Sequence, residues 1–224
     1  MSRIKAILFD LDGTLLDTLD DLATSMNIVL ARLGLPVHPR EHYRYFVGDG
    51  MEVLARRVLP EALRTPEMIR RCSEGMRDEY QGRWAVASRP YDGIGDLLPA
   101  LSSRGLVLNI LSNKPDGFTR LMVDHFLAAV TWRQVRGARP GVAQKPDPAG
   151  ALAIAGELGL RPDQFLYLGD TNTDMMTATA AGMFPVGALW GFRTREELAQ
   201  SGAKTLLSHP LDLLDAIDQG LGEN

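Results

Sequence analysis

Four aspartates in two short segments are the residues of this chain best suited to catalysis. Asp10 and Asp12 follow one short apolar run, with a single residue between them. Asp170 and Asp174 follow another apolar run and are four positions apart. If these carboxylates converge, their mutual repulsion must be compensated, and a hard divalent cation is the natural partner of carboxylate oxygens. Mg²⁺ suits such a set because it takes oxygen ligands from few carboxylates together with a bound phosphate.

Two more polar residues would complete a set for phosphoryl transfer. Ser112 ends a third apolar run, and its hydroxyl and the backbone amides that follow are potential donors to phosphate oxygens. Lys145 precedes a proline and would balance negative charge on a nucleophile and a phosphate. Taken alone, each of these residues is better explained as a turn former, a helix cap or a solvated lysine. We interpret Lys114 in that way, as a neighbour of the site.

Alternating strands and helices would bring these residues together. Short apolar runs predict strands at residues 4–9, 107–111, 165–168, 184–189 and 203–207. Helical spacing of apolar residues predicts helices at 93–103, 118–127, 148–158 and 172–181. This order is typical of a Rossmann-like parallel α/β sheet, in which the carboxyl ends of the strands share one edge. A further strand just before Arg136 is an open alternative, because residues 130–135 are too polar to predict it.

A helical block interrupts this alternation directly after the first strand. Between residues 17 and 89 the apolar spacing is helical throughout, with helices predicted at 19–33, 51–59 and 65–82. A block entered from the end of a strand would lie over the edge where sheets of this class bind ligands. We therefore predict an α/β core of residues 1–16 and 85–224 and an inserted helical cap domain of residues 17–84.

Four ordered motifs resemble those of the haloacid dehalogenase-like hydrolases, and in particular the phosphoglycolate phosphatase type. They are Asp10-Leu11-Asp12-Gly13-Thr14-Leu15, Leu111-Ser112-Asn113-Lys114-Pro115, Lys145-Pro146 and the segment from Gly169 to Asp174. Together they span essentially the whole chain in the family's order. The resemblance implies a Mg²⁺-dependent phosphatase that acts through an aspartyl-phosphate.

The resemblance also implies a role for each charged motif residue. Asp10 would be the nucleophile, and Asp12 would be first the general acid and then the general base. Mg²⁺ would be bound by the Asp10 carboxylate, the Asp12 backbone carbonyl and Asp170. Asp174 would support the metal directly or through water, and Lys145 would be the catalytic cation.

The residues expected to contact the phosphate or the rest of the substrate are Ser112, Asn113, Gly48, Asp49 and Gly50. The last three lie in a segment that resembles the cap loop of phosphoglycolate phosphatases. Its glycines would allow close backbone approach, and the helix that follows would offer amides to an anion. Asp49 departs from the family pattern, and an extra acid there would disfavour a substrate that carries a carboxylate. Closure of this cap over the substrate would exclude water, with flexing in the two linkers.

Several other activities compete with a phosphoglycolate phosphatase. Halide-displacing relatives lack an acid at the position of Asp12, and phosphonate-cleaving relatives use a cap lysine, whereas no lysine lies between Lys5 and Lys114. A small phosphomonoester is therefore the expected substrate, with 2-phosphoglycolate as the named candidate. A sugar phosphate, a nucleotide or pyrophosphate stays open as the substrate. A sugar-phosphate mutase or a non-catalytic binding protein on the same fold also stays open.

Composition sets the remaining expectations. The chain has 224 residues, a net charge of −4 and no basic run, so we expect no nucleic-acid partner. No apolar stretch approaches the length of a membrane span, so we expect no membrane partner either. The single cysteine, Cys72, excludes an internal disulfide and suits a reducing compartment. We therefore expect a cytoplasmic monomer or homodimer whose partner is a small phosphorylated metabolite.

Overall fold

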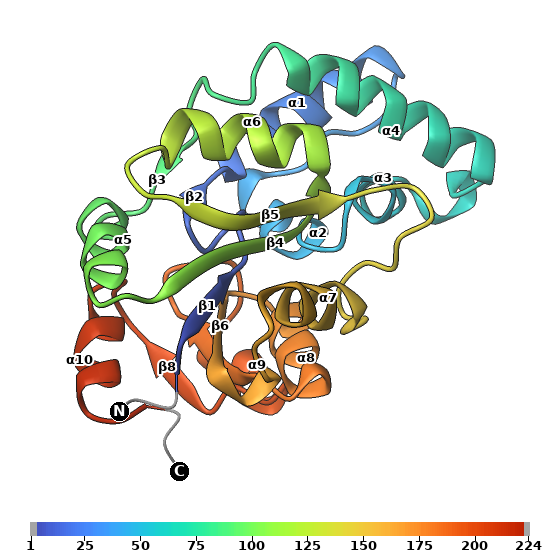
Figure 1. Cartoon of the computed structure of the whole chain (residues 1–224). Helices are drawn as coiled ribbons and strands as arrows, with labels where there is room; N and C mark the ends of the chain where they lie inside the picture. The colour runs from blue at the N-terminus through green and yellow to red at the C-terminus, as the bar shows by residue number, and fades with distance from the viewer. Residues whose placement is uncertain (1–3, 222–224) are drawn as a thin grey trace.

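Six parallel strands form the main sheet of the computed structural model, which describes residues 4–221 (Figure 1). Their order across the sheet is β5-β4-β1-β6-β7-β8. The strands are β1 (Ala6–Phe9), β4 (Val107–Pro115), β5 (Trp132–Ala138), β6 (Phe165–Gly169), β7 (Phe184–Ala188) and β8 (Thr205–Leu207). The Rossmann-like α/β core predicted from the sequence is thereby confirmed. Because β1 is central and the order reverses on its two sides, its carboxyl end is where a ligand crevice is expected.

Helices cover both faces of this sheet. One face carries α5 (Ile94–Ser103), α6 (Asp116–Phe126) and α10 (Asp212–Asp218). The other carries α7 (Ala149–Leu158) and α8 (Asn172–Ala181), while the short α9 (Arg195–Gln200) contacts α8 and β8. Ile7 and Phe9 of β1 pack in the first apolar cluster, and Ala6 and Leu8 pack in the second. Strands with both faces buried need continuous apolar runs, which is why such runs in the sequence predicted the central strands.

β5 is the strand that the sequence left open. It lies at the edge of the sheet beside β4, and most of its residues are partly exposed. An edge strand with one side in solvent can carry charged residues such as Arg133 and Arg136, so its sequence lacks the apolar signature of a buried strand.

The predicted helical insertion is present between β1 and the rest of the core. It contains α1 (Leu19–Arg32), α2 (Tyr43–Phe46), α3 (Met51–Val58) and α4 (Pro66–Gln81). These helices enclose an apolar cluster of their own, and among the buried residues described in it only Phe192 comes from outside the insertion. The proposed domain boundaries at 16/17 and 84/85 stay a prediction. Short 3₁₀ turns also occur at Arg40–His42, Glu61–Leu63 and Pro162–Gln164.

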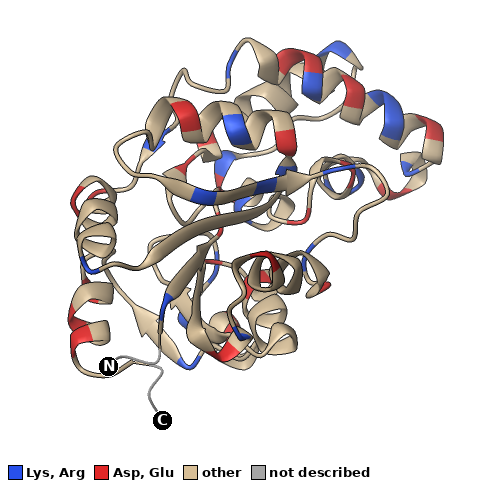
Figure 2. Cartoon of the chain, viewed as in Figure 1, with Lys and Arg blue, Asp and Glu red and all other residues tan. Residues whose placement is uncertain are grey.

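α4 illustrates how the sequence defines these helices. Thr65 caps its first turn by accepting a hydrogen bond from the backbone N–H of Met68, and Pro66 occupies the first helical position. Basic and acidic residues are interspersed along its outer surface (Figure 2). Its inner side is buried and includes Cys72, whose pKa burial raises to about 11. A protonated thiol of this kind is unreactive, which supports a structural role for Cys72.

The two linkers between insertion and core pair with each other. β2 (Leu16–Asp17) and β3 (Arg89–Pro90) form a two-stranded antiparallel ladder that the sequence did not predict. The Asp21 carboxylate reinforces the junction by accepting hydrogen bonds from the backbone N–H groups of Ala87 and Ser88. Among residues 4–221, no helix is both long and apolar enough to cross a membrane.

Candidate active site

The polar residues predicted from the sequence lie at the carboxyl ends of three adjacent strands. β1 pairs with β4 on one side and with β6 on the other. Asp10 directly follows β1, Ser112 lies in the last part of β4, and Asp170 directly follows β6. The parallel pairing therefore brings together side chains that are more than fifty residues apart in the chain.

Three carboxylates form a buried cluster at this edge. Asp10, Asp170 and Asp174 each offer an oxygen, and these oxygens lie within 4.8 Å of one another. Asp12 is not part of this group, because its carboxylate turns to Lys114 instead. The expectation that four carboxylates converge is therefore corrected to three. A contribution of the Asp12 backbone carbonyl to metal binding stays a prediction.

Lys145 is the cation of this cluster. Its Nζ lies 2.8 Å from Asp10 Oδ1 as an ion pair and donates a hydrogen bond of 2.6 Å to Asp174 Oδ1. Only 2% of its side chain is exposed, so it is not a solvated loop lysine. Burial alone would lower the pKa of Lys145, but Asp10 and Asp174 outweigh burial and hold the pKa well above its ordinary value. The ammonium therefore stays charged.

The cluster carries more negative than positive charge. Without a further cation, burial and the nearby Asp174 carboxylate raise the pKa of Asp10 to about 7, against the opposing effect of Lys145. Burial, Asp174 and Asp10 likewise raise the pKa of Asp170 well above its ordinary value. Three carboxylates against one ammonium leave a net charge of −2 when all are ionised. A divalent cation matches this charge and the all-oxygen donor set, so the residues present fit Mg²⁺.

Asp170 is positioned from several sides. Its Oδ1 accepts a hydrogen bond of 2.8 Å from Thr14 Oγ1, and its Oδ2 accepts one of 2.8 Å from the backbone N–H of Phe192. Gly13 has φ +85°, and a Cβ on it would lie 2.2 Å from Asp170 Oδ2. A Cβ on Gly191 would clash with the same side chain. Only glycine therefore fits these two close approaches.

Asp174 is oriented by the start of α8. Its Oδ2 accepts hydrogen bonds from the backbone N–H and the hydroxyl of Thr171, which forms a capping box with it. The Asp170–Asp174 spacing seen in the sequence thus places one carboxylate at the end of β6 and the other in the first turn of a helix.

Asp12 belongs to a second charged network, which the sequence analysis missed. Lys114 Nζ lies 3.0 Å from Asp12 Oδ1 and donates a hydrogen bond of 2.9 Å to the hydroxyl of Tyr80. Burial would lower the pKa of Lys114, but Asp12 and Tyr80 outweigh it and raise the pKa above its ordinary value. Lys114 is buried, so its interpretation as a solvated neighbour is wrong. Only its place two residues after Ser112 could have indicated that Lys114 belongs to the site, because its partners Asp12 and Tyr80 lie far away in the sequence.

Ser112 and Asn113 lie beside this network. Ser112 is buried, and its Oγ accepts a hydrogen bond from the backbone N–H of Lys114. Asn113 exchanges hydrogen bonds with the backbone of Lys145 and donates one of 3.2 Å to the carbonyl oxygen of Gly48. Its side chain therefore connects the core, the Lys145 loop and the insertion. Asn113 also lines the pocket, and its contact with the substrate stays a prediction.

The insertion loop reaches the site through its glycines rather than through Asp49. Gly48 and Gly50 have φ of +107° and +88° and line the pocket above Asp10. The Asp49 carboxylate instead accepts a hydrogen bond of 2.6 Å from Thr173 and pairs with Arg57. Its side chain is not brought into that pocket, so the extra acid does not face the substrate position.

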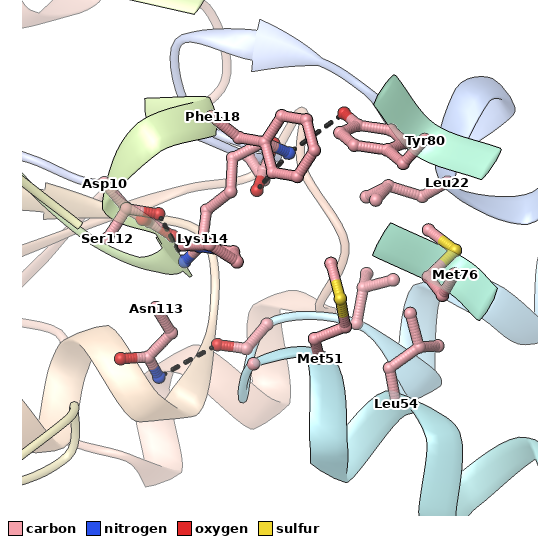
Figure 3. Close-up of a pocket in the computed structure, with 15 residues that line it drawn as sticks. Asp10, Leu22, Met51, Leu54, Met76, Tyr80, Ser112, Asn113, Lys114 and Phe118 are labelled. Atoms are coloured by element: carbon pink, nitrogen blue, oxygen red, sulfur yellow. Dashed lines mark hydrogen bonds and ion pairs between the residues drawn. The ribbon is translucent and has the colours of Figure 1, made fainter. Parts of the chain in front are cut away.

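The pocket above Asp10 lies between the core and the insertion (Figure 3). Asp10, Asp12, Ser112, Asn113 and Lys114 line its core side. Apolar residues line the opposite side, and most of them come from the insertion. Asp10 and Asp12 thus face this cavity, whereas Lys145, the third predicted catalytic residue, pairs with Asp10 and is not part of the lining.

Comparisons with known proteins agree with this geometry. The sequence model of the haloacid dehalogenase-like hydrolase family matches residues 7–188. An N-acetylmuramic acid 6-phosphate phosphatase of Pseudomonas aeruginosa is 32% identical, with 98% of this chain and 97% of that protein aligned. A phosphoglycolate phosphatase of Mannheimia succiniciproducens is 31% identical, with 96% of this chain and 99% of that protein aligned.

A solved structure shares the complete fold. The crystal structure of a predicted phosphoglycolate phosphatase from Haemophilus somnus has a TM-score of 0.90 at 29% identity, and the superposition covers 97% of this chain and 99% of that one. The matching family model, the full-length relatives and the ordered motifs around a buried aspartate cluster lead to the same conclusion: the chain belongs to the haloacid dehalogenase-like hydrolase family.

Proposed function

We propose that this protein is a Mg²⁺-dependent phosphatase that hydrolyses a small phosphomonoester through an aspartyl-phosphate. The observation that carries the proposal is the buried cluster of Asp10, Asp170 and Asp174 with Lys145 beside Asp10, at the carboxyl end of β1. Bound Mg²⁺ would be held by these carboxylates and would neutralise charge on the phosphoryl oxygens.

The first half of the reaction forms a covalent intermediate. The Asp10 carboxylate attacks phosphorus, so an Asp10 oxygen–phosphorus bond forms as the bond to the leaving oxygen breaks. Protonated Asp12 gives its proton to that oxygen, and the alcohol departs. Lys145, ion-paired with Asp10, and the Ser112 hydroxyl orient the reacting groups.

The second half releases phosphate. Asp12, now ionised, takes a proton from a water molecule, and the water oxygen attacks phosphorus. The bond between phosphorus and Asp10 breaks, which restores the Asp10 carboxylate and the Asp12 proton. Asp12 suits both steps because its carboxylate lies at the pocket surface and is fixed by Lys114 rather than by the acidic cluster.

Two relatives supply the first substrates to test, 2-phosphoglycolate and N-acetylmuramic acid 6-phosphate. A sugar phosphate, a nucleotide and pyrophosphate complete the panel. Rapid hydrolysis of the phosphoenzyme would exclude a mutase, which must protect that intermediate from water. Release of phosphate from any of these compounds would exclude a purely binding role.

The insertion would act as the cap of this enzyme. We propose that residues 17–84 move over the pocket as one body, with flexing at the β2–β3 linkers. The apolar connection between insertion and core involves Phe192, Phe118 and Trp84, and this small number supports the proposal, since a large apolar interface would fix the insertion to the core. We place the protein in the cytoplasm, and monomer and homodimer are both compatible with the proposal.

The test measures phosphate release from this panel with and without Mg²⁺, in the wild type and in Asp10→Asn. The matched control is Asp124→Asn, which removes the same charge from the exposed face of α6. We expect activity that requires Mg²⁺, is lost in Asp10→Asn and is retained in the control. Activity that survives in Asp10→Asn would overturn the assignment of the nucleophile.

A further inference from the structure

The pocket above Asp10 has two chemically different sides. Its floor, on the core, contains the polar catalytic candidates. Its roof is formed by Leu22, Met51, Leu54, Met76, Tyr80 and Phe118, which come from α1, α3 and α4 of the insertion and from α6 (Figure 3). A phosphate held at the floor would direct its leaving group toward this roof, so the roof selects the leaving group.

No free basic side chain belongs to the lining of this pocket within the described residues. Lys114 is the only basic residue there, and its ammonium is already bound by the Asp12 carboxylate and the Tyr80 hydroxyl. A substrate carboxylate would have to compete with Asp12 for Lys114. That competition would also disturb the residue proposed to protonate the leaving group.

Among the described residues, no arginine of the insertion lines the inner pocket. Arg57 pairs with Asp49 and donates to the carbonyl oxygen of Phe46. Arg77 of α4 lines a neighbouring cleft that shares Gly50, Met51 and Asn113 with the inner pocket, but Arg77 itself is not among the residues of the inner pocket. A positive feature of the roof is the amino end of α3 at Met51, whose dipole is equivalent to roughly half a charge.

These surroundings disfavour a charged leaving group. A carboxylate taken into the roof would lose its hydration without gaining a cation, which is costly. An alkyl group would instead bury apolar surface against Leu54 and Phe118, which is favourable. Met51 and Met76 are flexible and can adapt to groups of different shape.

We propose that the substrate is a phosphomonoester whose leaving alcohol is uncharged and apolar beside the phosphate, rather than one that carries a carboxylate there. This inference rests on the proposed phosphatase function and specifies the substrate class of the same site. An alkyl phosphate satisfies it, whereas 2-phosphoglycolate does not.

Three matched esters test the inference: n-propyl phosphate, 2-phosphoglycolate and the neutral carboxamide analogue of 2-phosphoglycolate. All are esters of short primary alcohols and are compared by kcat/KM with Mg²⁺ present. We expect kcat/KM for n-propyl phosphate to be at least about tenfold higher than kcat/KM for 2-phosphoglycolate, because the roof offers the carboxylate no partner. The value for the carboxamide is expected to lie between the two.

A pair of variants tests the electrostatic cause. Met51→Lys places an ammonium at the partly exposed edge of the inner pocket, whereas Val53→Lys adds the same charge to α3 outside the inner pocket. Met51→Lys is expected to shift the ratio of 2-phosphoglycolate to n-propyl phosphate by about tenfold toward 2-phosphoglycolate, and Val53→Lys is expected to leave it unchanged. Thermal unfolding of both variants checks that the insertion remains folded.

The outcomes separate this inference from the function on which it rests. Wild-type kcat/KM for 2-phosphoglycolate equal to or above that for n-propyl phosphate would overturn the inference while leaving the phosphatase intact. A ratio that Met51→Lys does not change would overturn the electrostatic cause. Failure to release phosphate from every ester would overturn the phosphatase function itself, and the substrate class with it.

Discussion

At the scale of single residues, two lysines supply the positive charge of the site, and each pairs with different carboxylates. Lys145 holds Asp10 and Asp174 together, and Lys114 holds Asp12 away from them. Because their lysine partners differ, Asp10 and Asp12 have different surroundings although they are only two positions apart. Asp10 is buried in an acidic cluster beside its counterion, whereas the Asp12 carboxylate lies in the pocket lining and pairs with Lys114.

Removal of the Lys145 ammonium is predicted to impair both folding and catalysis. In Lys145→Met, Asp10 and Asp174 would repel each other in a buried site, and breaking a buried ion pair costs about 3–5 kcal/mol. We expect a comparable loss in the free energy of unfolding, measured in urea, with a fall in kcat of at least about 100-fold. Lys204→Met, at an exposed position, is the matched control. Equal stability and activity in the two variants would contradict the role of Lys145.

The site residues that could be predicted are those identified by their immediate sequence neighbours. Asp10 and Asp170 directly follow apolar strand segments, so the sequence alone indicates that both lie at the carboxyl edge of the sheet. Thr14, Tyr80 and the backbone of Phe192 were missed, because their contacts are with residues distant in the sequence. No spacing rule connects Tyr80 to Lys114, and only the folded insertion brings them together.

At the scale of elements, α4 matters to the chemistry although it lies outside the core. It contributes Tyr80, whose hydroxyl accepts from Lys114 and donates toward the sulfur of Met122. Burial raises the pKa of Tyr80, so the phenol stays protonated and neutral. The helix thereby helps to fix the lysine that orients Asp12.

Tyr80→Phe is predicted to slow substrates that need a proton donor. Without the hydroxyl, Lys114 loses one partner and holds Asp12 less firmly, so we expect kcat for n-propyl phosphate to fall by about tenfold. The effect on p-nitrophenyl phosphate should be smaller, since its leaving group departs without protonation. Tyr45→Phe is the control, because Tyr45 is half-exposed. Equal losses for both esters would argue that Tyr80 only stabilises the insertion.

The elements themselves were predictable to the extent that they are buried on both sides. The central strands have continuous apolar sequences, and α8 was predicted with its observed limits of residues 172 and 181. β5 was left open because it is a half-exposed edge strand. β2 and β3 have two residues each, and such short ladders depend on tertiary pairing rather than on a sequence pattern.

At the scale of the whole molecule, the site is assembled by the meeting of core and insertion. Hydrogen bonds from Asn113 to Gly48 and from Thr173 to Asp49 join the two parts around the pocket. Phe192 packs in the insertion while its backbone N–H binds Asp170. The acidic cluster and the placement of the insertion are therefore physically connected.

Binding of Mg²⁺ is predicted to stabilise the folded protein, because the cation offsets the net charge of −2 in the cluster. At a concentration 100 times its Kd, a ligand of the folded state contributes about 2.7 kcal/mol. For a chain of 224 residues this corresponds to a rise in Tm of about 5–10 °C. Thermal unfolding with and without Mg²⁺ measures this rise in Tm. Asp170→Asn should abolish the rise and Asp124→Asn should retain it, and a rise that persists in Asp170→Asn would place the metal elsewhere.

The most direct test of the account is the covalent intermediate itself. In Asp12→Asn the residue proposed to activate water is absent, so the phosphoenzyme should form more slowly and then persist. The measurement is mass spectrometry of peptides after acid quench with an activated substrate, p-nitrophenyl phosphate, and Mg²⁺. The account predicts a phosphoryl group on Asp10 in Asp12→Asn and none in Asp10→Asn. A phosphoryl group on any other residue, or phosphate released by the wild type with no phosphoenzyme trapped in Asp12→Asn, would contradict it.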